Sequence, residues 1–272
     1  MVSQEQRRRQ LAREKFLRQQ QRRTSARRKT HTRNAVIAAV VGVVVAGGAL
    51  SYLTGAFKSD DKKANAGAEV TPSATPSKAP DPCEKPAAGA VKKLTWKKEP
   101  AVTIDTSAAY TMKMATTCGD IDIALKASAA PHTVNSFDFL AGKGYFDHTK
   151  CHRLTTNGIY VLQCGDPTAQ GSGGPGYTIP DENLKDKTLK GGVYPAGTIA
   201  MANTGQKHTG GSQYFLVYKD SQLPPSYTPF GTISKSGLTV LEKIAAAGES
   251  TGQGDGAPNA TVVINKLTVT KS

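Results

Sequence analysis

The spacing of apolar and polar residues changes twice along the chain. An uncharged apolar run covers residues 35–53, and the segment after it, up to about residue 107, is poor in apolar residues. From residue 108 on, short stretches alternate apolar with polar positions, which is the period of a strand with one buried face. The pattern therefore predicts an apolar segment, a polar segment and a β-rich C-terminal domain.

The C-terminal domain, residues 108–272, is predicted to be all-β with two helices. A helix is expected from Pro131, which suits the first turn, to Gly142 or Gly144, and a second one covers 238–245. Eight short antiparallel strands suit a closed barrel, because closure removes exposed strand edges. These strands are expected at 110–116, 121–125, 150–154, 160–164, 197–202, 213–218, 229–233 and 262–270.

Residues 35–57 are predicted to form a transmembrane helix that acts as a signal anchor. The uncharged run of about twenty residues is long enough to cross the apolar core of a bilayer. The basic arm before it, residues 1–34, contains most of the positive excess of a chain with a formal net charge of +14. Positive residues stay on the cytoplasmic side, so the N-terminus is expected in the cytoplasm and the chain after Phe57 outside it.

Two alternatives concern this N-terminal region. Ala64-Asn65-Ala66 has the form of a signal-peptide cleavage site, so the apolar run could be removed after export. The run is longer than the apolar part of most signal peptides, and a charged decapeptide separates it from that site, which favours a retained anchor. The Arg-rich arm could bind nucleic acid. Beside a membrane span, however, it is interpreted as a topology signal that lies against anionic headgroups.

Residues 58–107 are predicted to be a disordered extracytoplasmic linker. The part from 71 to 82 is rich in Pro and low in apolar residues, so it cannot bury a core of its own and tends toward extended conformations. Trp96 is the only Trp of the chain and is expected to pack on the rim of the domain.

Four short motifs follow one another in the predicted strands. They are His152-Arg153, Val161 to Pro167, Met201-Ala202-Asn203 and Gly211 to Phe215. Their series closely resembles the cyclophilin family of peptidyl-prolyl cis-trans isomerases, in the membrane-anchored form found in actinobacteria. The resemblance extends over residues ~108–271. It implies an eight-stranded barrel with a helix covering each end.

The chemistry of such an enzyme requires little from the protein. The barrier to twisting an X–Pro bond, about 18–20 kcal/mol, is the loss of amide resonance. No nucleophile, metal or cofactor is needed, only groups that bind the twisted amide better than the planar forms. Twisting restores the lone pair of the proline nitrogen, and Arg offers it a permanently charged, rigid set of N–H donors. The resemblance assigns this role to Arg153.

The resemblance also implies a substrate groove around Arg153. Gln163 would bind the substrate backbone and orient Arg153, and Asn203 would bind through its main chain. Tyr160 and Val161 would lie in the proline pocket, with Phe215 as its floor. The complete implied set is Tyr160, Val161, Gln163, Ala202, Asn203, Thr204, Gln213, Phe215, Gln222, Leu223 and Tyr227.

Three departures from the family pattern concern this groove. Gln222 replaces a large aromatic residue of many relatives, Tyr227 replaces a His, and the turn after Arg153 is two residues longer. They leave isomerase activity expected but weaken the expectation of tight cyclosporin binding. They also keep open an alternative, a peptide-binding or holdase chaperone module that uses the same groove with little turnover.

The four Cys residues favour disulfides over zinc, since no C-x-x-C occurs. Three pairings are possible, and sequence proximity favours Cys151–Cys164, which leaves Cys83 for Cys118. Strict alternation from Arg153 and Gln163 would turn Cys151 and Cys164 to opposite faces, so the pairing requires a bulge in the lengthened turn. Residues 171–176 match G-x-G-x-x-G, but no helix follows, and they are interpreted as a loop beside the groove.

These inferences together predict a single-pass cell-membrane protein with an extracytoplasmic cyclophilin-type isomerase domain. Its substrates would be proline-containing exported polypeptides, whose folding it would accelerate. Neither a cofactor nor a metal is expected, because the five His residues lack ligand spacing. We also expect a monomer that does not bind nucleic acid.

Overall fold

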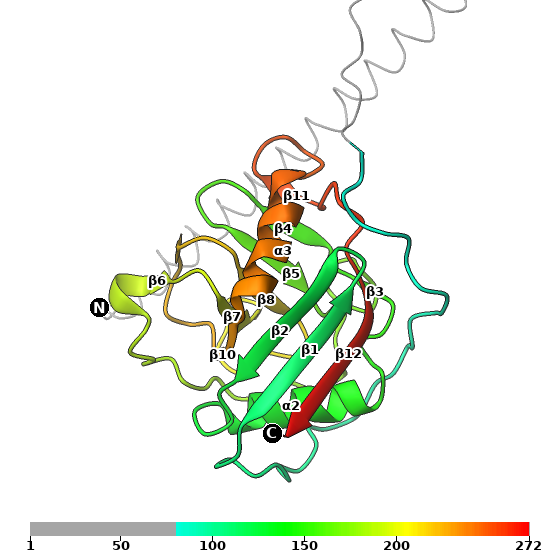
Figure 1. The fold of residues 1–272 in the computed structure, drawn as a ribbon. Helices are drawn as coiled ribbons and strands as arrows, with labels where there is room; N and C mark the ends of the chain where they lie inside the picture. The colour runs from blue at the N-terminus through cyan, green and yellow to red at the C-terminus, as the bar shows by residue number, and fades with distance from the viewer. Residues whose placement is uncertain (1–79, 272) are drawn as a thin grey trace, which may run out of the picture. The chain divides into compact units, whose positions relative to one another are not determined.

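A computed structural model describes residues 80–271 of the 272-residue chain (Figure 1). The basic arm, the predicted transmembrane helix at 35–57 and the first part of the predicted linker lie outside these residues. Within the described part, every helix is too short or too polar to cross a bilayer.

Ten antiparallel strands form the main sheet, in the order β11-β4-β5-β8-β7-β10-β2-β1-β12-β3. Their bounds are β1 Tyr110–Thr116, β2 Gly119–Leu125, β3 Thr149–Lys150, β4 Arg153–Thr155, β5 Val161–Cys164, β7 Thr198–Met201, β8 Tyr214–Val217, β10 Pro229–Ile233, β11 Asp255–Gly256 and β12 Val263–Lys271. A separate two-stranded sheet joins β6 (Val193–Tyr194) to β9 (Ser221–Gln222). A short 3-10 helix, η1 (Lys190–Gly192), precedes β6.

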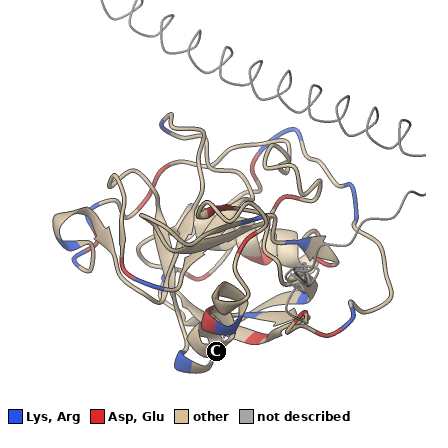
Figure 2. Cartoon of the chain, turned by 90° about the horizontal axis from the view of Figure 1, so that it is seen from above, with Lys and Arg blue, Asp and Glu red and all other residues tan. Residues whose placement is uncertain are grey.

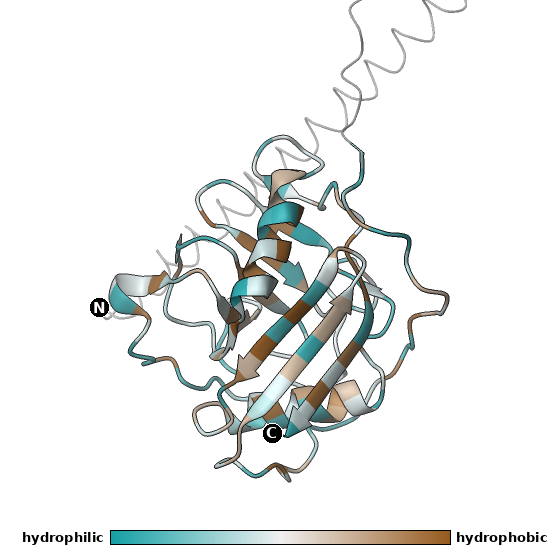
Figure 3. Cartoon of the chain, viewed as in Figure 1, coloured by the Kyte–Doolittle hydropathy of each residue, from teal (hydrophilic) through white to brown (hydrophobic). Residues whose placement is uncertain are grey.

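The alternating pattern explains the predicted hairpin. On β1, Met112 and Met114 are fully buried and Lys113 between them is exposed, and on β2 Ile121 and Ile123 are fully buried. Figure 3 shows the corresponding change between apolar and polar colours along these strands. The predicted all-β class and the hairpin are therefore confirmed.

The strands are shorter and more numerous than predicted. The expected strand 150–154 is divided into β3 and β4, and β6, β9 and β11 have two residues each, too few for a periodic signal. β11 and β3 end the hydrogen-bonded order, and only Cys151 and His152 separate β3 from β4. The sheet is thus a cyclophilin-like half-barrel, and its full closure stays a prediction.

Two helices accompany the main sheet within the described residues. α2 (Pro131–Gly142) starts at the predicted Pro and packs against β12, and its Phe137 ring stacks on Phe146 at 5.2 Å. α3 (Lys235–Ala246) starts three residues earlier than predicted, because Ser234 caps it by accepting a hydrogen bond from the Gly237 N–H. It packs against β2 (Figure 1).

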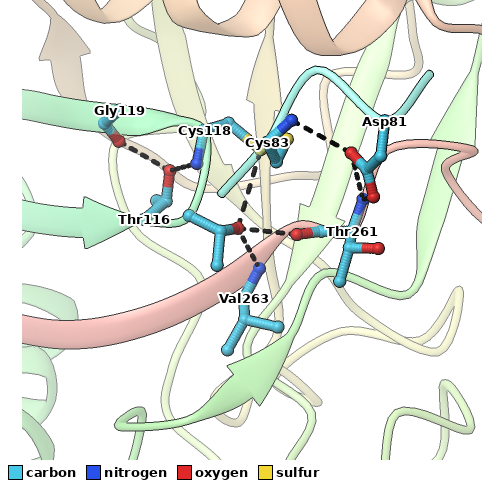
Figure 4. Close-up of a disulfide and its surroundings, with 8 residues drawn as sticks. Asp81, Cys83, Thr116, Cys118, Gly119, Thr261 and Val263 are labelled. Atoms are coloured by element: carbon cyan, nitrogen blue, oxygen red, sulfur yellow. Dashed lines mark hydrogen bonds between the residues drawn. A yellow bond between two sulfur atoms is a disulfide. The ribbon is translucent and has the colours of Figure 1, made fainter. Parts of the chain in front are cut away.

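Residues 80–107, here called the strap, have no helix or strand but lie against the domain. Its start is fixed by the Cys83–Cys118 disulfide (Figure 4). A hydrogen bond from Glu84 N–H to the Thr117 carbonyl follows directly after it. Farther along, the Trp96 ring packs edge-on against Phe139 at 5.1 Å, as expected for this residue. Composition showed that this segment has no core of its own. The structure adds that Cys83, Leu94, Trp96 and Ile104 of the strap pack on the core of the domain, whereas Val102 is exposed.

Charged residues are spread over the domain. Figure 2 shows Lys and Arg interspersed with Asp and Glu over loops, helices and strands. Most of the positive excess of the chain lies in the basic arm, outside the described residues.

Candidate active site

Three polar side chains, two on the neighbouring strands β4 and β5 and one directly before β8, form one chain of hydrogen bonds. Arg153 on β4 lies opposite Gln163 on β5, and its Nη1 donates to Gln163 Oε1 at 3.2 Å. Gln163 Nε2 donates to Gln213 Oε1 at 2.8 Å, and Gln213 Nε2 donates to the Gly173 carbonyl at 2.9 Å. Each amide is both donor and acceptor, so the orientation of every group in the chain is fixed. The structure therefore brings these predicted residues together.

An apolar cavity of about 110 Å³ opens beside Arg153. The Phe215 side chain is buried there, and the Tyr227 ring stands nearly perpendicular to it, with their centroids 5.4 Å apart. Tyr194 fixes Tyr227 by donating a hydrogen bond to its carbonyl at 2.8 Å. The residues that line the cavity are Arg153, Ile159, Val161, Gln163, Ala202, Asn203, Phe215, Leu223 and Tyr227.

Tyr160 lies outside this lining set, in contrast to the expectation from the family, and Ile159 takes its place. The Tyr160 ring packs against Tyr218 at 6.0 Å, and Lys219 Nζ lies 4.5 Å from its centre. Successive side chains of an extended segment point to opposite faces, so Ile159 and Val161 share a face that Tyr160 does not. Alternation from Gln163 could have given this result from the sequence.

Gln222 also lies outside the lining set. Its Nε2 donates to the Gly191 carbonyl at 2.8 Å, so the side chain is bound to η1. The next residue, Leu223, lines the cavity as expected, and its N–H donates to the Gly192 carbonyl.

A larger groove of about 670 Å³ adjoins the apolar cavity, and Gln163, Ala202 and Asn203 line both. Thr204 and Gln213 line it too, as predicted, and so does the loop of residues 171–176. Both polar groups of the Asn203 side chain are bound to backbone, to Gly205 N–H and to the Ser226 carbonyl. This arrangement fits the expected use of the Asn203 main chain.

The buried carboxylate of Asp166 organises the loop that forms one wall of the groove. It accepts hydrogen bonds from the N–H groups of Thr168 at 2.7 Å and of Ser172 and Gly173 at 3.0 Å. Burial alone would raise the pKa of this carboxyl. The hydrogen bonds, chiefly from Gly173 and Thr168, outweigh burial and hold the pKa below its ordinary value.

A carboxylate that the sequence did not indicate meets Arg153 from the far end of the chain. Asp255 Oδ1 accepts from Arg153 Nε and Asp255 Oδ2 accepts from Nη2, both at 2.8 Å. This hydrogen bond and the charge of Asp255 raise the pKa of the guanidinium. The two residues are 102 positions apart, and β11 is too short for a periodic signal, so no sequence pattern joins them.

Both favoured disulfide pairings are confirmed. Cys83–Cys118 joins the strap to the β1–β2 turn, and Cys151–Cys164 joins the segment before β4 to the end of β5, with a Cα–Cα distance of 4.1 Å. The expected bulge in the lengthened turn was wrong. Alternation is interrupted on the other side of Arg153, because Cys151 precedes β4 and its N–H donates to the Val262 carbonyl.

Comparisons with known proteins agree with this geometry. Residues 111–269 match the sequence profile of the family described as cyclophilin type peptidyl-prolyl cis-trans isomerase/CLD. The probable peptidyl-prolyl cis-trans isomerase B of Mycobacterium leprae (strain TN) is 50% identical over 168 residues, which are 59% of this chain and 57% of the relative. The protein of the same name in Mycobacterium tuberculosis (strain CDC 1551 / Oshkosh) is 43% identical over 212 residues, 75% of this chain and 65% of the relative.

A shorter relative is matched over most of its length. The peptidyl-prolyl cis-trans isomerase B of Bacillus subtilis (strain 168) is 40% identical over 126 residues, which are 46% of this chain and 82% of the relative. The match to the two mycobacterial proteins, in contrast, covers less than two thirds of their length. Because the family profile matches more than half of the sequence, the chain belongs to the cyclophilin-type peptidyl-prolyl cis-trans isomerase family.

Proposed function

We propose that the chain is a peptidyl-prolyl cis-trans isomerase. The observation that carries the proposal is the position of Arg153, whose guanidinium lines the same apolar cavity as the buried Phe215 ring. An apolar cavity of about 110 Å³ suits the small ring of proline, and the adjoining groove suits the residues before it. Family membership and the names of the relatives support the same activity.

The mechanism follows from the donors of Arg153. The guanidinium has five N–H donors, and within the described residues three of them form hydrogen bonds, one to Gln163 and two to Asp255. Two N–H donors therefore stay available for a substrate. As the X–Pro bond twists, the proline nitrogen regains its lone pair and accepts one of them, while both planar forms offer no such acceptor. Binding the twisted form better by about 4–7 kcal/mol would accelerate exchange about 10³–10⁵-fold.

The holdase alternative depends on three departures from the family pattern, and Arg153 and Gln163 line the cavity despite all three. Gln222 is bound to Gly191 away from it, Tyr227 supplies an aromatic wall, and the lengthened turn supplies Ile159. An NMR exchange assay on a short Ala-Pro peptide tests the proposal with the fragment 83–272. Exchange accelerated at catalytic concentrations supports an isomerase. Binding of the peptide without acceleration would support the holdase.

We further propose that residues 35–57 anchor the protein in the cell membrane as a single-pass helix. The N-terminus would be cytoplasmic, and the isomerase domain would act on proline-containing exported polypeptides as a monomer. Two disulfides support an oxidising, extracytoplasmic compartment. Protease added to intact protoplasts should remove the domain and spare a tag fused to the N-terminus. Protection of the domain would contradict the proposed topology.

A further inference from the structure

The ion pair between Arg153 and Asp255 has the geometry of a positioning device. Both carboxylate oxygens are engaged, one by Nε and one by Nη2, each at 2.8 Å. A single bond would let the guanidinium rotate about it, whereas two parallel bonds fix its plane. The third bond, from Nη1 to Gln163 Oε1, then approaches the guanidinium from the side of β5.

The pair contributes little to the stability of the fold. The Arg153 side chain is 38% exposed and the Asp255 side chain 54% exposed. Exposed ion pairs of this kind are screened by solvent and stabilise proteins only weakly. The hydrogen bonds that hold the loop of Asp255 in place therefore need an explanation other than the stability of this ion pair.

A second carboxylate, Glu249, builds the loop that presents Asp255. Glu249 is buried, and its oxygens accept from the Thr251 N–H at 2.6 Å and from the Gly254 N–H at 2.7 Å. The loop is thereby closed upon itself just before Asp255. Its position does not depend on the Arg153 side chain, because the bonds that shape it are internal.

The lengthened turn after Arg153 contacts this loop. Thr156 N–H donates to the Gly254 carbonyl at 2.9 Å, and Asp255 pairs with Thr155 as β11 adds to β4 (Figure 1). Gly254 has a φ of +92°, and a Cβ there would lie 2.5 Å from Asn157 Cβ. The turn and the loop thus fit each other closely, and their contact places Asp255 beside Arg153.

We propose that Asp255 is a positioning residue of the isomerase reaction, which holds the Arg153 guanidinium in the plane that presents its two remaining N–H donors to the proline nitrogen. This inference rests on the proposed function. Glu249 and the lengthened turn contribute to the positioning of Arg153 indirectly, because they place the Asp255 carboxylate. Asp255 would act through Arg153 and not on the substrate itself.

A competing electrostatic effect acts in the opposite direction. The carboxylate also offsets the positive charge of Arg153, which by itself would weaken the attraction of the developing lone pair. Removal of the charge therefore has opposite consequences under the two effects. If positioning dominates, Asp255→Asn slows exchange, and if charge offset dominates, it accelerates exchange.

The test compares Asp255→Asn and Asp255→Glu with the unmodified fragment 83–272 on an Ala-Pro peptide. We expect Asp255→Asn to lower kcat about tenfold with KM nearly unchanged, because the donor geometry matters in the twisted state. Asp255→Glu, which keeps both oxygens, should recover part of the loss. Asp120→Asn is the matched control, since Asp120 forms an exposed ion pair with Lys113 on the β1–β2 hairpin and should leave kcat unchanged.

A double-mutant cycle separates this inference from the proposed function. In an Arg153→Ala background, Asp255→Asn should change the rate by less than about twofold, because its effect acts through Arg153. The NMR signal of the Arg153 Nε–H should shift in Asp255→Asn irrespective of turnover. A near-normal or raised kcat in Asp255→Asn, or a loss confined to KM, would overturn the positioning role. Activity retained by Arg153→Ala would instead overturn the role of Arg153 on which this inference rests, and a lack of accelerated exchange by the unmodified protein would overturn the proposed function itself.

Discussion

Ile159 and Tyr160 are neighbours in the chain but belong to different surroundings. Ile159 lines the apolar cavity beside Arg153, and Tyr160 packs on Tyr218 away from it. Ile159→Ala should lower kcat/KM about fivefold, because a proline ring loses roughly 1 kcal/mol of apolar contact. Tyr160→Ala should stay within about twofold of the unmodified protein. Peptide exchange kinetics of both variants measures these effects. A larger loss of kcat/KM in Tyr160→Ala than in Ile159→Ala would restore the expectation from the family.

Residue roles were predictable where the sequence contains a motif. Arg153, Gln163, Gln213 and Phe215 were assigned from the resemblance and meet at one site. Asp255 was missed, because its role depends on a contact across 102 residues. Tyr160 was expected in the pocket from the family pattern, whereas alternation back from Gln163 favours Ile159 and Val161, which line the cavity. Single positions thus follow from motifs, and partners brought by tertiary contact do not.

The groove wall at residues 168–173 depends on the Asp166 carboxylate, which accepts several backbone N–H groups. The folded pKa of Asp166 lies below its ordinary value of 3.8. Its contribution to stability is therefore complete above about pH 4 and is lost as the pH falls through the folded pKa. Asp166→Asn should lower the free energy of unfolding at pH 7 and raise KM.

The pH dependence of this loss of stability shows whether the ionised Asp166 carboxylate is its cause. The difference in unfolding free energy between Asp166→Asn and the unmodified fragment should shrink as the pH falls below about 4, because Asp166 then binds a proton in the unfolded chain before it does so in the folded protein. Urea titrations at pH 7, 4 and 3 measure it. A difference that is constant over this range would show that the ionised carboxylate does not organise the loop.

The strap should stabilise the domain and the groove loop. Cys83–Cys118 closes a loop with a sequence separation of 35, and Trp96 N–H donates to the carbonyl of Pro175, which lines the groove. A fragment 108–272 with Cys118→Ser should lose about 2–4 kcal/mol of stability compared with 83–272. Its KM should also rise, because the groove wall loses the Trp96 contact.

The matched control keeps the strap and removes only the disulfide. The fragment 83–272 with Cys83→Ser and Cys118→Ser separates the contribution of the cross-link from that of Trp96 packing. Chemical denaturation and exchange kinetics on the three fragments measure both. Equal stability and equal KM for 83–272 and 108–272 would show that the strap is only a linker, as composition suggested.

Elements with a regular period were predictable, and irregular ones were not. The β1–β2 hairpin and the start of α2 at Pro131 follow from alternation and from a helix-start signal. The two-residue strands β6, β9 and β11 depend on partners far along the chain. The strap could not be predicted for the same reason. Its apolar residues form no periodic pattern, and Leu94, Trp96 and Ile104 pack only against the core of the folded domain.

At the scale of the whole molecule, the account combines an enzymatic domain with a proposed membrane anchor. The start of the strap is fixed by its disulfide with Cys118, so the chain between residue 57 and Cys83 would be the part that connects the domain to the bilayer. About 25 residues of Pro-rich chain can span several tens of ångströms. The domain would thus reach emerging polypeptides without leaving the membrane surface.

The central claim is that Arg153 stabilises the twisted X–Pro bond, and Arg153→Ala tests it most directly. The measurement is the exchange rate of an Ala-Pro peptide by NMR, alongside thermal unfolding of the same fragment 83–272. We predict a loss of exchange activity of at least about 10²-fold with an almost unchanged unfolding temperature, because Arg153 is half-exposed and contributes little to the core. Near-normal exchange by a folded Arg153→Ala protein would contradict the account.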